Sequence, residues 1–431
     1  MSDPRPQEGA GGPAPGLLAQ IPPELRLTRP LQLPAPLSEA ELTARLHELA
    51  APNTHLDEAV CFLGGGAYDH YVPAIVDQVA GSVPPCAVTP SSPQPVLQAV
   101  WELQALFAAL AGIERACAPF ADGPSAFAEA IRAAARATGR SQAIVARAAN
   151  PRYRAIARTL LTPPIELLEA GYHGGATRPS DVERLLSPRV ACVAIEQPNY
   201  FGCFEDLSAF AQAAHHHGAL LVVKADPIAL GILSPPGAFG ADIVVADAQP
   251  LGTRPLYGSE SLGLLACREA LIDAICSWRV ERREGGFQAV GRERQAVRLD
   301  RLVRPIAYLA AVGGEGLARA AALSMGMARS TQRAITALEG FSLRFRAPFF
   351  KEFAVECDRD PEEIAQALLE SNILGALPLR PDYPEMENCA LFAATERRSL
   401  ADVELLRHTL ELLGEFDTGE RDDLSLGSDD V

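Results

Sequence analysis

Beyond residue 123 the chain alternates between short apolar runs and longer stretches in which apolar residues recur at helical spacing. The apolar runs predict buried strands at residues 142–148, 190–199, 219–227, 241–250 and 262–268. Two Ala-rich stretches between them, each ending at a glycine, predict helices at 125–139 and 205–218. Strands that alternate with helices of this length predict an α/β fold with a mostly parallel central sheet, covered by helices on both faces.

The same patterning divides the chain into an arm, two domains and a tail. Residues 1–60 read as a flexible Pro/Gly-rich arm followed by a first helix, which begins at a Ser/Glu capping box at residues 38–41. Residues 61–304 form the large α/β domain, and residues 305–415 form a connector helix and a smaller C-terminal α+β domain. The acidic, polar residues 416–431 are expected to be disordered.

Charge and hydropathy exclude two classes of partner. The sequence has 38 basic and 54 acidic residues, a net charge of −16, and no basic stripe, so nucleic-acid binding is not expected. No uninterrupted apolar window of about 18 residues predicts a membrane span. The N-terminus lacks the basic start and apolar block of a secretory signal, which favours a cytoplasmic protein.

Cysteine usage points to the same compartment. The nine cysteines show no paired spacing, which favours reduced core thiols over a disulfide framework or a metal site. The consecutive histidines His215, His216 and His217 precede Gly218 at a predicted helix end. Consecutive residues on a helix point about 100° apart, so the three side chains cannot chelate one ion together. No metal is expected.

The turn after the strand at 241–250 raises the question of catalysis. Enzymes that use pyridoxal phosphate (PLP) on an α/β scaffold commonly carry their cofactor lysine on such a turn, but here it holds Gln249 and Pro250. Lys224 and Lys351 are the only lysines in the sequence. Lys224 lies at a strand end, where it could reach solvent or pair with Asp226, and a catalytic amine role is disfavoured for both lysines.

The glycine-rich stretch GGGAYDHY at residues 64–71 allows two interpretations. It can be a tight loop packed under its own aromatic rings. Alternatively, Tyr68, Asp69, His70 and Tyr71 concentrate acid, base and hydrogen-bonding groups, which is unusual for a mere connector. Ligands of parallel sheets bind beyond the carboxyl ends of the strands, where the segments EQPNYFG, KADPIALG and ADAQPLG are predicted to lie.

Several stretches, in the same order along the chain, resemble subunit 1 of the two-subunit glycine decarboxylase, the P-protein of the glycine cleavage system. They read IPPELRLTRPLQLPAPLSEAEL, CFLGGGAYDHYVPAIVDQV, QPNYFGCFEDL, ADPIALGILSPPGAFGADIVVADAQPLG, PFFKEFAV and RPDYPEMENCALFAATE. The resemblance implies a fold of the PLP-dependent transferase fold type I. It also implies that Pro250 stands at the Schiff-base position, and that Lys224 stands about where subunit 2 has its pyridine-binding aspartate.

The implied function is that of a subunit of glycine dehydrogenase (aminomethyl-transferring, decarboxylating), an oxidoreductase. Together with a PLP-bearing subunit 2, it would decarboxylate glycine and pass the aminomethyl group to the lipoyl carrier, the H-protein, in an α2β2 assembly. This chain would hold no PLP covalently and would carry no catalytic residue of its own. Its candidates for the shared active site are Tyr68, Asp69, His70, Tyr71, Asn199, Tyr200 and Phe201.

Two loops depart from the family pattern. Residues 89–98 read TPSSPQPVLQ, without the tyrosine, glutamate and glycine of the family loop, and residues 257–261 read YGSES where the family has YGGPH-type residues. These differences favour an alternative function for the same scaffold, that of a diverged, non-catalytic homologue that scaffolds or regulates a PLP-enzyme partner.

Overall fold

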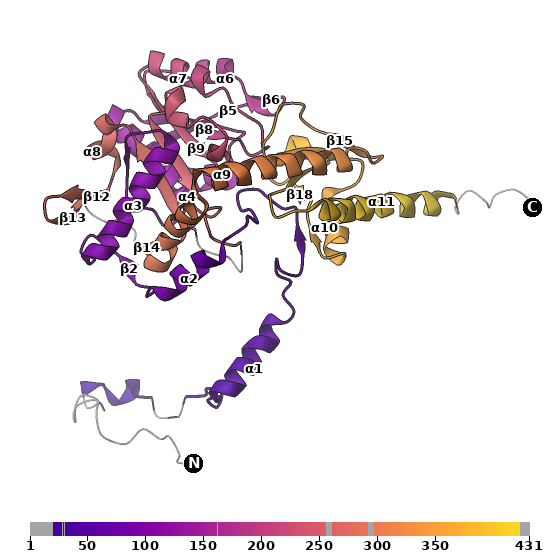
Figure 1. Ribbon diagram of the computed structural model, residues 1–431, viewed down its shortest axis with the longest axis horizontal. Coiled ribbons are helices and arrows are strands. Elements are labelled where there is room, and N and C mark those ends of the chain that lie inside the picture. Colours follow the sequence, from indigo (N-terminus) through magenta and orange to yellow (C-terminus); the bar gives the residue numbers. More distant parts are fainter. Residues whose placement is uncertain are drawn as a thin grey trace, which may run out of the picture. The chain divides into compact units, whose positions relative to one another are not determined.

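The computed structural model describes residues 20–27, 29, 31–161, 163–255, 261–291 and 297–422 (Figure 1). The chain forms two compact units, which divide between Thr54 and His55. The first unit contains a short 3-10 helix, η2 (Pro23–Leu25), and helix α1 (Glu39–Ala50). The Ser38 and Glu41 side chains form the predicted capping box at the start of α1, which confirms that expectation. No residue of α1 is buried.

The second unit is built on a seven-stranded sheet. Its order is β3 (Arg115–Ala116), β11 (Gly263–Cys267), β10 (Ile243–Asp247), β9 (Leu220–Ala225), β8 (Val190–Gln197), β4 (Gln142–Ala146) and β5 (Glu166–Ala170). The pairs among β10, β9, β8, β4 and β5 are parallel, and only β11 runs against its neighbours. The predicted mostly parallel sheet is therefore confirmed.

Helices cover this sheet, and its inner strands β4, β8, β9, β10 and β11 are buried along nearly their whole length. Helix α4 (Gly123–Thr138) packs on β8 to β11, and α7 (Leu207–His216) packs on β8 and β9. In Figure 1 strands β8 and β9 lie between α7 and α4. Helix α3 (Gln94–Ala111) packs along β3 and β11, and α5 (Pro151–Leu161) packs on α4. Short elements α2 (Ala74–Ser82), α6 (Pro179–Glu183) and α8 (Ile272–Ile275) complete the layers.

A second, antiparallel sheet follows along the chain, with the order β15 (Phe341–Leu343), β16 (Glu352–Cys357), β19 (Cys389–Ala393) and β18 (Leu377–Pro378). Helices α10 (Pro361–Glu370) and α11 (Leu400–Asp422) accompany it. The predicted boundary at residue 61 falls inside this region, because β1 (Val60–Cys61) pairs with β17 (Ile373–Leu374) and Phe62 is buried in the same core. Of the predicted tail 416–431, residues up to Asp422 continue α11, and the rest lie outside the described residues.

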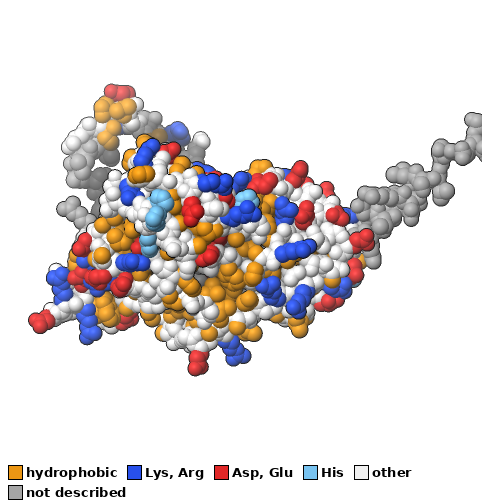
Figure 2. Space-filling view, turned by 90° about the horizontal axis from the view of Figure 1, so that it is seen from above, with side chains coloured by type: hydrophobic (Ala, Val, Ile, Leu, Met, Phe, Trp, Pro, Cys, Tyr) orange, Lys and Arg blue, Asp and Glu red, His pale blue; other side chains and the backbone are white. Residues whose placement is uncertain are grey.

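The sheets are linked by α9 (Leu299–Ile335), which is interrupted at Gly313, where φ is 61°. Among the described residues, α9 is the one helix long and apolar enough to cross a membrane, judged by length and composition; 17% of that window is buried. A helix of a globular core passes the same test, and α9 packs against α2, α3 and α11. Figure 2 shows apolar side chains gathered between charged ones on one face of the molecule.

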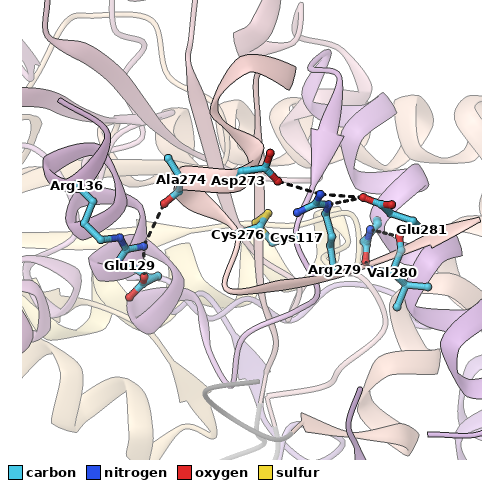
Figure 3. Close-up of a disulfide and its surroundings, with 10 residues drawn as sticks. Cys117, Glu129, Arg136, Asp273, Ala274, Cys276, Arg279, Val280 and Glu281 are labelled. Carbon is cyan, nitrogen blue, oxygen red and sulfur yellow. Dashed lines mark hydrogen bonds and ion pairs between the residues drawn. A yellow bond between two sulfur atoms is a disulfide. The ribbon is translucent and has the colours of Figure 1, made fainter. Parts of the chain in front are cut away.

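The expectation that all cysteines are free thiols is wrong for one pair. Cys117, which follows β3, and Cys276, which precedes β12 (Trp278–Arg283), form a disulfide (Figure 3). Their Cα atoms lie 5.2 Å apart although 159 positions separate them in the sequence. Only the tertiary fold brings the two residues together, so their spacing in the sequence gave no sign of pairing. The bond fastens the base of the β12–β13 hairpin (β13, Gly286–Gly291) to the edge of the large sheet.

Candidate functional site

The candidate site lies where the strand order of the large sheet reverses. From β4 the chain passes to β5 on one side and later to β8 on the other, so the crevice outside the carboxyl ends of β4 and β8 is a topological switch point. Glu196 near the end of β8 accepts a hydrogen bond from the Asn150 N–H, which follows β4, at 2.5 Å. The Asn150 amide donates to the Gly65 carbonyl at 2.9 Å, and so brings the glycine loop to this crevice.

The turn after β10 uses its side chain to hold the same loop. The Gln249 amide donates to the carbonyls of Tyr68, at 2.9 Å, and Thr253, at 2.7 Å, and its oxygen accepts from the Tyr68 N–H at 3.0 Å. Pro250 follows, and a proline has no amine that could form a Schiff base. The turn that commonly carries a cofactor lysine here holds the glycine loop in place through the Gln249 side chain.

Lys224 is buried, and its ammonium pairs with the Glu196 carboxylate on the neighbouring strand. The expectation that it reaches solvent or pairs with Asp226 is therefore wrong, because adjacent parallel strands place Lys224 directly opposite Glu196. Burial opposes the charge, but the Glu196 carboxylate raises the pKa of Lys224 above its ordinary value. Lys224 is thus the buried cation of a structural ion pair near the end of β9.

Lys351, just before β16, is the cation that pairs with Asp226, at 2.6 Å. Its Nζ also lies 2.9 Å from Nε2 of His70 and 3.4 Å from the centre of the Tyr68 ring. An ammonium group only donates, so Nε2 of His70 must accept, and its Nδ1 then donates to Glu396 at 2.8 Å. Burial lowers the pKa of Lys351, against the attraction of Asp226.

Two further carboxylates complete the cluster. Glu352 accepts hydrogen bonds from the Gly65 N–H at 2.6 Å and the Tyr68 hydroxyl at 2.7 Å, yet burial raises its pKa to about 7. Burial also disfavours the charge of Glu396, but its interaction with His70 and the hydrogen bonds from the Tyr71 N–H and Ser324 outweigh burial and lower its pKa to about 2. The pKa values of the two carboxyl groups are therefore shifted in opposite directions from that of an ordinary glutamate.

Little free space remains between these side chains. The cavity at the carboxyl ends of β8 and β9 has a volume of about 10 Å³, roughly what one water requires. It is lined by Tyr68, Glu196, Pro198, Gly202, Lys224, Asp226, Phe350, Lys351 and Glu352. A pyridoxal group does not fit there, no lysine stands on the turn to bind it, and cationic Lys224 would repel a protonated pyridine nitrogen.

The structure buries three of the four candidate residues in the glycine loop. Tyr68, Asp69 and His70 are buried, whereas Tyr71 is 58% exposed. Asp69 is held by Arg397 at 2.8 Å and by Arg398 at 2.9 Å. The loop is partly a packed loop and partly a cluster of polar groups. Tyr68 is a buried ring, as expected for a packed loop. His70 bonds to Lys351 and Glu396, which are remote in the sequence, and Tyr71 faces outward.

The second candidate segment packs inward. The Asn199 amide donates to the carbonyl of Gly175 at 2.7 Å and to Glu205 at 2.8 Å. Tyr200 stacks on Tyr383, and Phe201 is buried in the same aromatic cluster. The two segments do approach each other, because a Cβ placed on Gly65 would lie 3.5 Å from the Tyr200 hydroxyl. Their role in a shared active site stays a prediction.

The divergent loops are only partly described. Residues 89–98 form a turn, in which the Thr89 N–H donates to the Ser92 hydroxyl at 2.9 Å, and the start of α3. Of the YGSES segment, residues 257–260 lie outside the described residues. In the histidine run, Nε2 of His215 lies 2.7 Å from Oδ2 of Asp242. The described part of the chain contains no group of three or more His, Cys, Asp or Glu side chains that could hold a metal ion.

Sequence reasoning missed Glu196, Glu352 and Glu396 as members of the cluster. A signal was present for the first two, since Glu196 stands inside the apolar run VACVAIEQ and Glu352 follows Lys351 in PFFKEFAV. A charged residue within a buried strand requires a buried partner of opposite sign. Pairing each acid with its base still required the fold.

Together, the sheet order and the small C-terminal sheet define fold type I of the PLP-dependent transferases, and the predicted fold class is confirmed. Solved structures of a sphingosine-1-phosphate lyase from Burkholderia pseudomallei (16% identity, TM-score 0.69) and a glutamate decarboxylase from Lactobacillus brevis (11%, 0.70) share this fold. They cover 96% and 90% of this chain, which covers 100% and 95% of theirs. The chain belongs to the glycine cleavage system P-protein family, whose model matches residues 16–277.

Individual relatives support this membership over almost the whole chain. A probable glycine dehydrogenase (decarboxylating) subunit 1 from Desulforamulus reducens is 39% identical over 413 residues, which are 90% of this chain and 93% of the relative. The corresponding protein of Carboxydothermus hydrogenoformans is 35% identical, with coverage of 92% and 94%. The crystal structure of an inhibitor-bound glycine decarboxylase (P-protein) matches with 36% identity, a TM-score of 0.83 and coverage of 92% and 94%.

Proposed function

We propose that this chain is subunit 1 of a two-subunit glycine decarboxylase. With a PLP-bearing subunit 2, it decarboxylates glycine and transfers the aminomethyl group to the lipoyl H-protein. The whole-chain similarity to proteins named as subunit 1 carries the proposal. Membership of the P-protein family and the fold shared with a solved glycine decarboxylase support it.

The division of labour follows from the filled crevice. This chain offers a cavity of about 10 Å³, no lysine on the turn after β10, and two lysines that are already paired. PLP, which supplies the electron sink for decarboxylation, is therefore held by the partner subunit. This chain contributes walls, orientation and exclusion of water at the shared active site.

Exposed apolar groups support an assembly with a partner. Leu42, Leu46 and Leu49 recur on one side of α1 and are exposed, and only 17% of the apolar window of α9 is buried. An obligate interface typically buries more than about 2,000 Å². We assign the complex an α2β2 composition and a cytoplasmic location. We also retain the division into domains 61–304 and 305–415, except that the segment around β1 packs with the smaller domain.

Within the shared active site, Tyr71 is the candidate best placed to face the partner. It is exposed, and its N–H is fixed by Glu396 at 2.7 Å, so its position is set by the buried cluster. Tyr68, Asp69 and His70 would then position the loop, and Asn199, Tyr200 and Phe201 would form its packed support.

Reconstitution tests this function. The chain is co-expressed with a cognate subunit 2, and glycine-dependent exchange of labelled bicarbonate is measured with the lipoyl carrier present. Exchange that requires both chains supports the proposal. A stable complex whose activity is independent of this chain, or absent although subunit 2 holds PLP, indicates the diverged scaffold or regulator instead. No complex and no exchange contradicts both.

A further inference from the structure

We propose that the crevice at the carboxyl edge of the large sheet is closed by a plug of buried ion pairs, built on the chain's two lysines, which excludes PLP and keeps both amines unreactive toward aldehydes. This inference deepens the proposed function, because it gives a physical reason why this subunit holds no cofactor. It concerns groups that no catalytic step uses, so it can be tested without measuring turnover.

The chain uses lysine only within this cluster. The sequence has 38 basic residues, yet Lys224 and Lys351 are the only lysines, and all other cations are arginines. Both lysines occur in this cluster, where Lys224 is 7% and Lys351 is 2% exposed. A chain that otherwise uses arginine has lysine only at these two buried positions.

The geometry explains this choice. An ammonium is a compact charge with three donors on a narrow stem, whereas guanidinium is a wide planar fork. Lys351 directs its charge at Asp226, His70 and the face of the Tyr68 ring from one position. Only about 10 Å³ of free space lies beside the lysines, so a wider guanidinium group at either position would have to displace its neighbours. Lysine is therefore the cation that can fill this space and satisfy all of these partners.

The plug also joins distant parts of the second unit. Glu196 and Lys224 belong to the large sheet, and Asp226 follows it. Lys351 immediately precedes the small sheet and Glu396 follows it, with His70 of the glycine loop between them. A ligand could enter the crevice only if these ion pairs separated, and each separation would leave an unpaired buried charge.

The direct test labels amines with PLP itself. The full-length chain, alone and with subunit 2, is incubated with PLP, reduced with borohydride, digested and analysed by mass spectrometry. The expected result is no pyridoxyl group on Lys224 or Lys351 in the folded chain, and labelling of both after unfolding in guanidinium. The unfolded sample is the matched control, since it shows that both amines can react. Stoichiometric labelling of either lysine in the folded chain overturns the proposal.

A cavity-rescue experiment tests the plug from the opposite direction. Lys351→Ala removes the ammonium and leaves Asp226 and His70 without their partner, so the midpoint of thermal unfolding should fall by about 5 °C or more. Ethylammonium or propylammonium should restore part of this loss, whereas tetramethylammonium, which cannot donate a hydrogen bond, should not. Lys351→Ala at wild-type stability, or no difference among the three amines, contradicts the plug.

The outcomes separate this inference from the proposed function. Labelling of a lysine together with normal bicarbonate exchange would remove the plug and leave the subunit assignment intact. No labelling and successful amine rescue, combined with a failed exchange assay, would retain the plug and remove the catalytic assignment. If Lys351→Ala does not fold, the labelling result on the unmodified chain still decides.

Discussion

Nζ of Lys351 lies 2.6 Å from Oδ2 of Asp226, and both side chains are buried, with exposed fractions of 2% and 9%. Lys351 precedes the small sheet, and Asp226 follows strand β9 of the large one. The ion pair therefore ties the two sheets together. Since the low dielectric of the interior strengthens the attraction but penalises an unpaired charge, removing one partner should cost far more than the pair itself contributes.

Asp226→Asn tests this asymmetry. The substitution keeps the size of the side chain but leaves the Lys351 ammonium without its anion, so we expect a loss of about 3–5 kcal/mol in the free energy of unfolding. Asp77→Asn is the matched control, because Asp77 pairs with Arg304 at 2.7 Å while 49% exposed, and should cost less than about 1 kcal/mol. Urea unfolding measures both. If the two variants lose similar amounts of unfolding free energy, burial does not make the Lys351–Asp226 pair more sensitive than an exposed pair.

The free energy of unfolding should depend on pH through the ionisation of Glu352. Burial raises its pKa from 4.5 to about 7, so the folded state binds this proton more tightly than the unfolded state does. The resulting stabilisation is fully present below pH 4.5 and is lost as the pH rises through about 7. Glu352→Gln should remove a pH-dependent contribution on the order of 3 kcal/mol between these limits. A constant difference between wild type and variant across this range would argue against a buried neutral carboxyl.

Glu396 should show the opposite trend. Burial disfavours its charge, but its interaction with His70 and the hydrogen bonds from the Tyr71 N–H and Ser324 outweigh burial and lower its pKa from 4.5 to about 2. Its stabilisation is present above pH 4.5 and is lost as the pH falls through about 2. Glu396→Gln should therefore destabilise the protein by about 3 kcal/mol at pH 7 and progressively less in acid. Unfolding curves at several pH values measure this, and a loss that grows toward low pH would refute it.

The disulfide offers a test that does not involve the cluster. A bond that closes a loop of 159 residues restricts the unfolded chain strongly, by up to about 5 kcal/mol in the chain-entropy description. Cys276→Ser should lower the free energy of unfolding under non-reducing conditions, whereas Cys86→Ser, at an exposed free cysteine, should not. Digestion without reductant should release a linked peptide that contains Cys117 and Cys276. Its absence would mean that the pair is reduced in solution.

Strands and helices were predictable from the sequence where a single segment shows a clear pattern of apolar residues. Strands such as β8 and β9 are continuous apolar runs, because they are buried on both faces of the sheet. Helix α5 and edge strand β5 were missed, since α5 is rich in arginine and β5 is largely half-exposed, so neither shows a clear apolar pattern. Their positions are set by packing on α4 and pairing with β4.

The site was predictable only as a location. The alternation of strands and helices placed it at the carboxyl edge of a parallel sheet, and the sequence of the turn after β10 showed that no cofactor lysine was present there. The partners of Lys224 and Lys351 were not predictable, because Glu196 and Asp226 are remote from them in the sequence or belong to a neighbouring strand. Long-range pairing of charges is decided by the fold, whereas the presence of a charge inside an apolar run is visible in the sequence itself.

Among the four candidate residues of the glycine loop, Tyr71 is the one that faces outward. Tyr71 is 58% exposed, and its backbone N–H donates to Glu396 at 2.7 Å, so the buried cluster holds the backbone while the residue faces outward. Tyr71→Ala should lower bicarbonate exchange of the reconstituted pair about tenfold or more, because a residue that borders the shared active site positions substrate or excludes water there. The free energy of unfolding should change by less than about 0.5 kcal/mol, as for other exposed side chains.

Leu369→Ala is the control, since Leu369 on α10 is 42% exposed and should affect neither property. His70→Ala completes the comparison, because it removes the partner of both Lys351 and Glu396 and should lower stability as well as exchange. The affinity of each variant for subunit 2 is measured separately, so that weakened assembly is not mistaken for lost catalysis. If Tyr71→Ala and Leu369→Ala behave alike in exchange, the glycine loop is a structural clamp only, and the shared active site must draw on other residues of this chain.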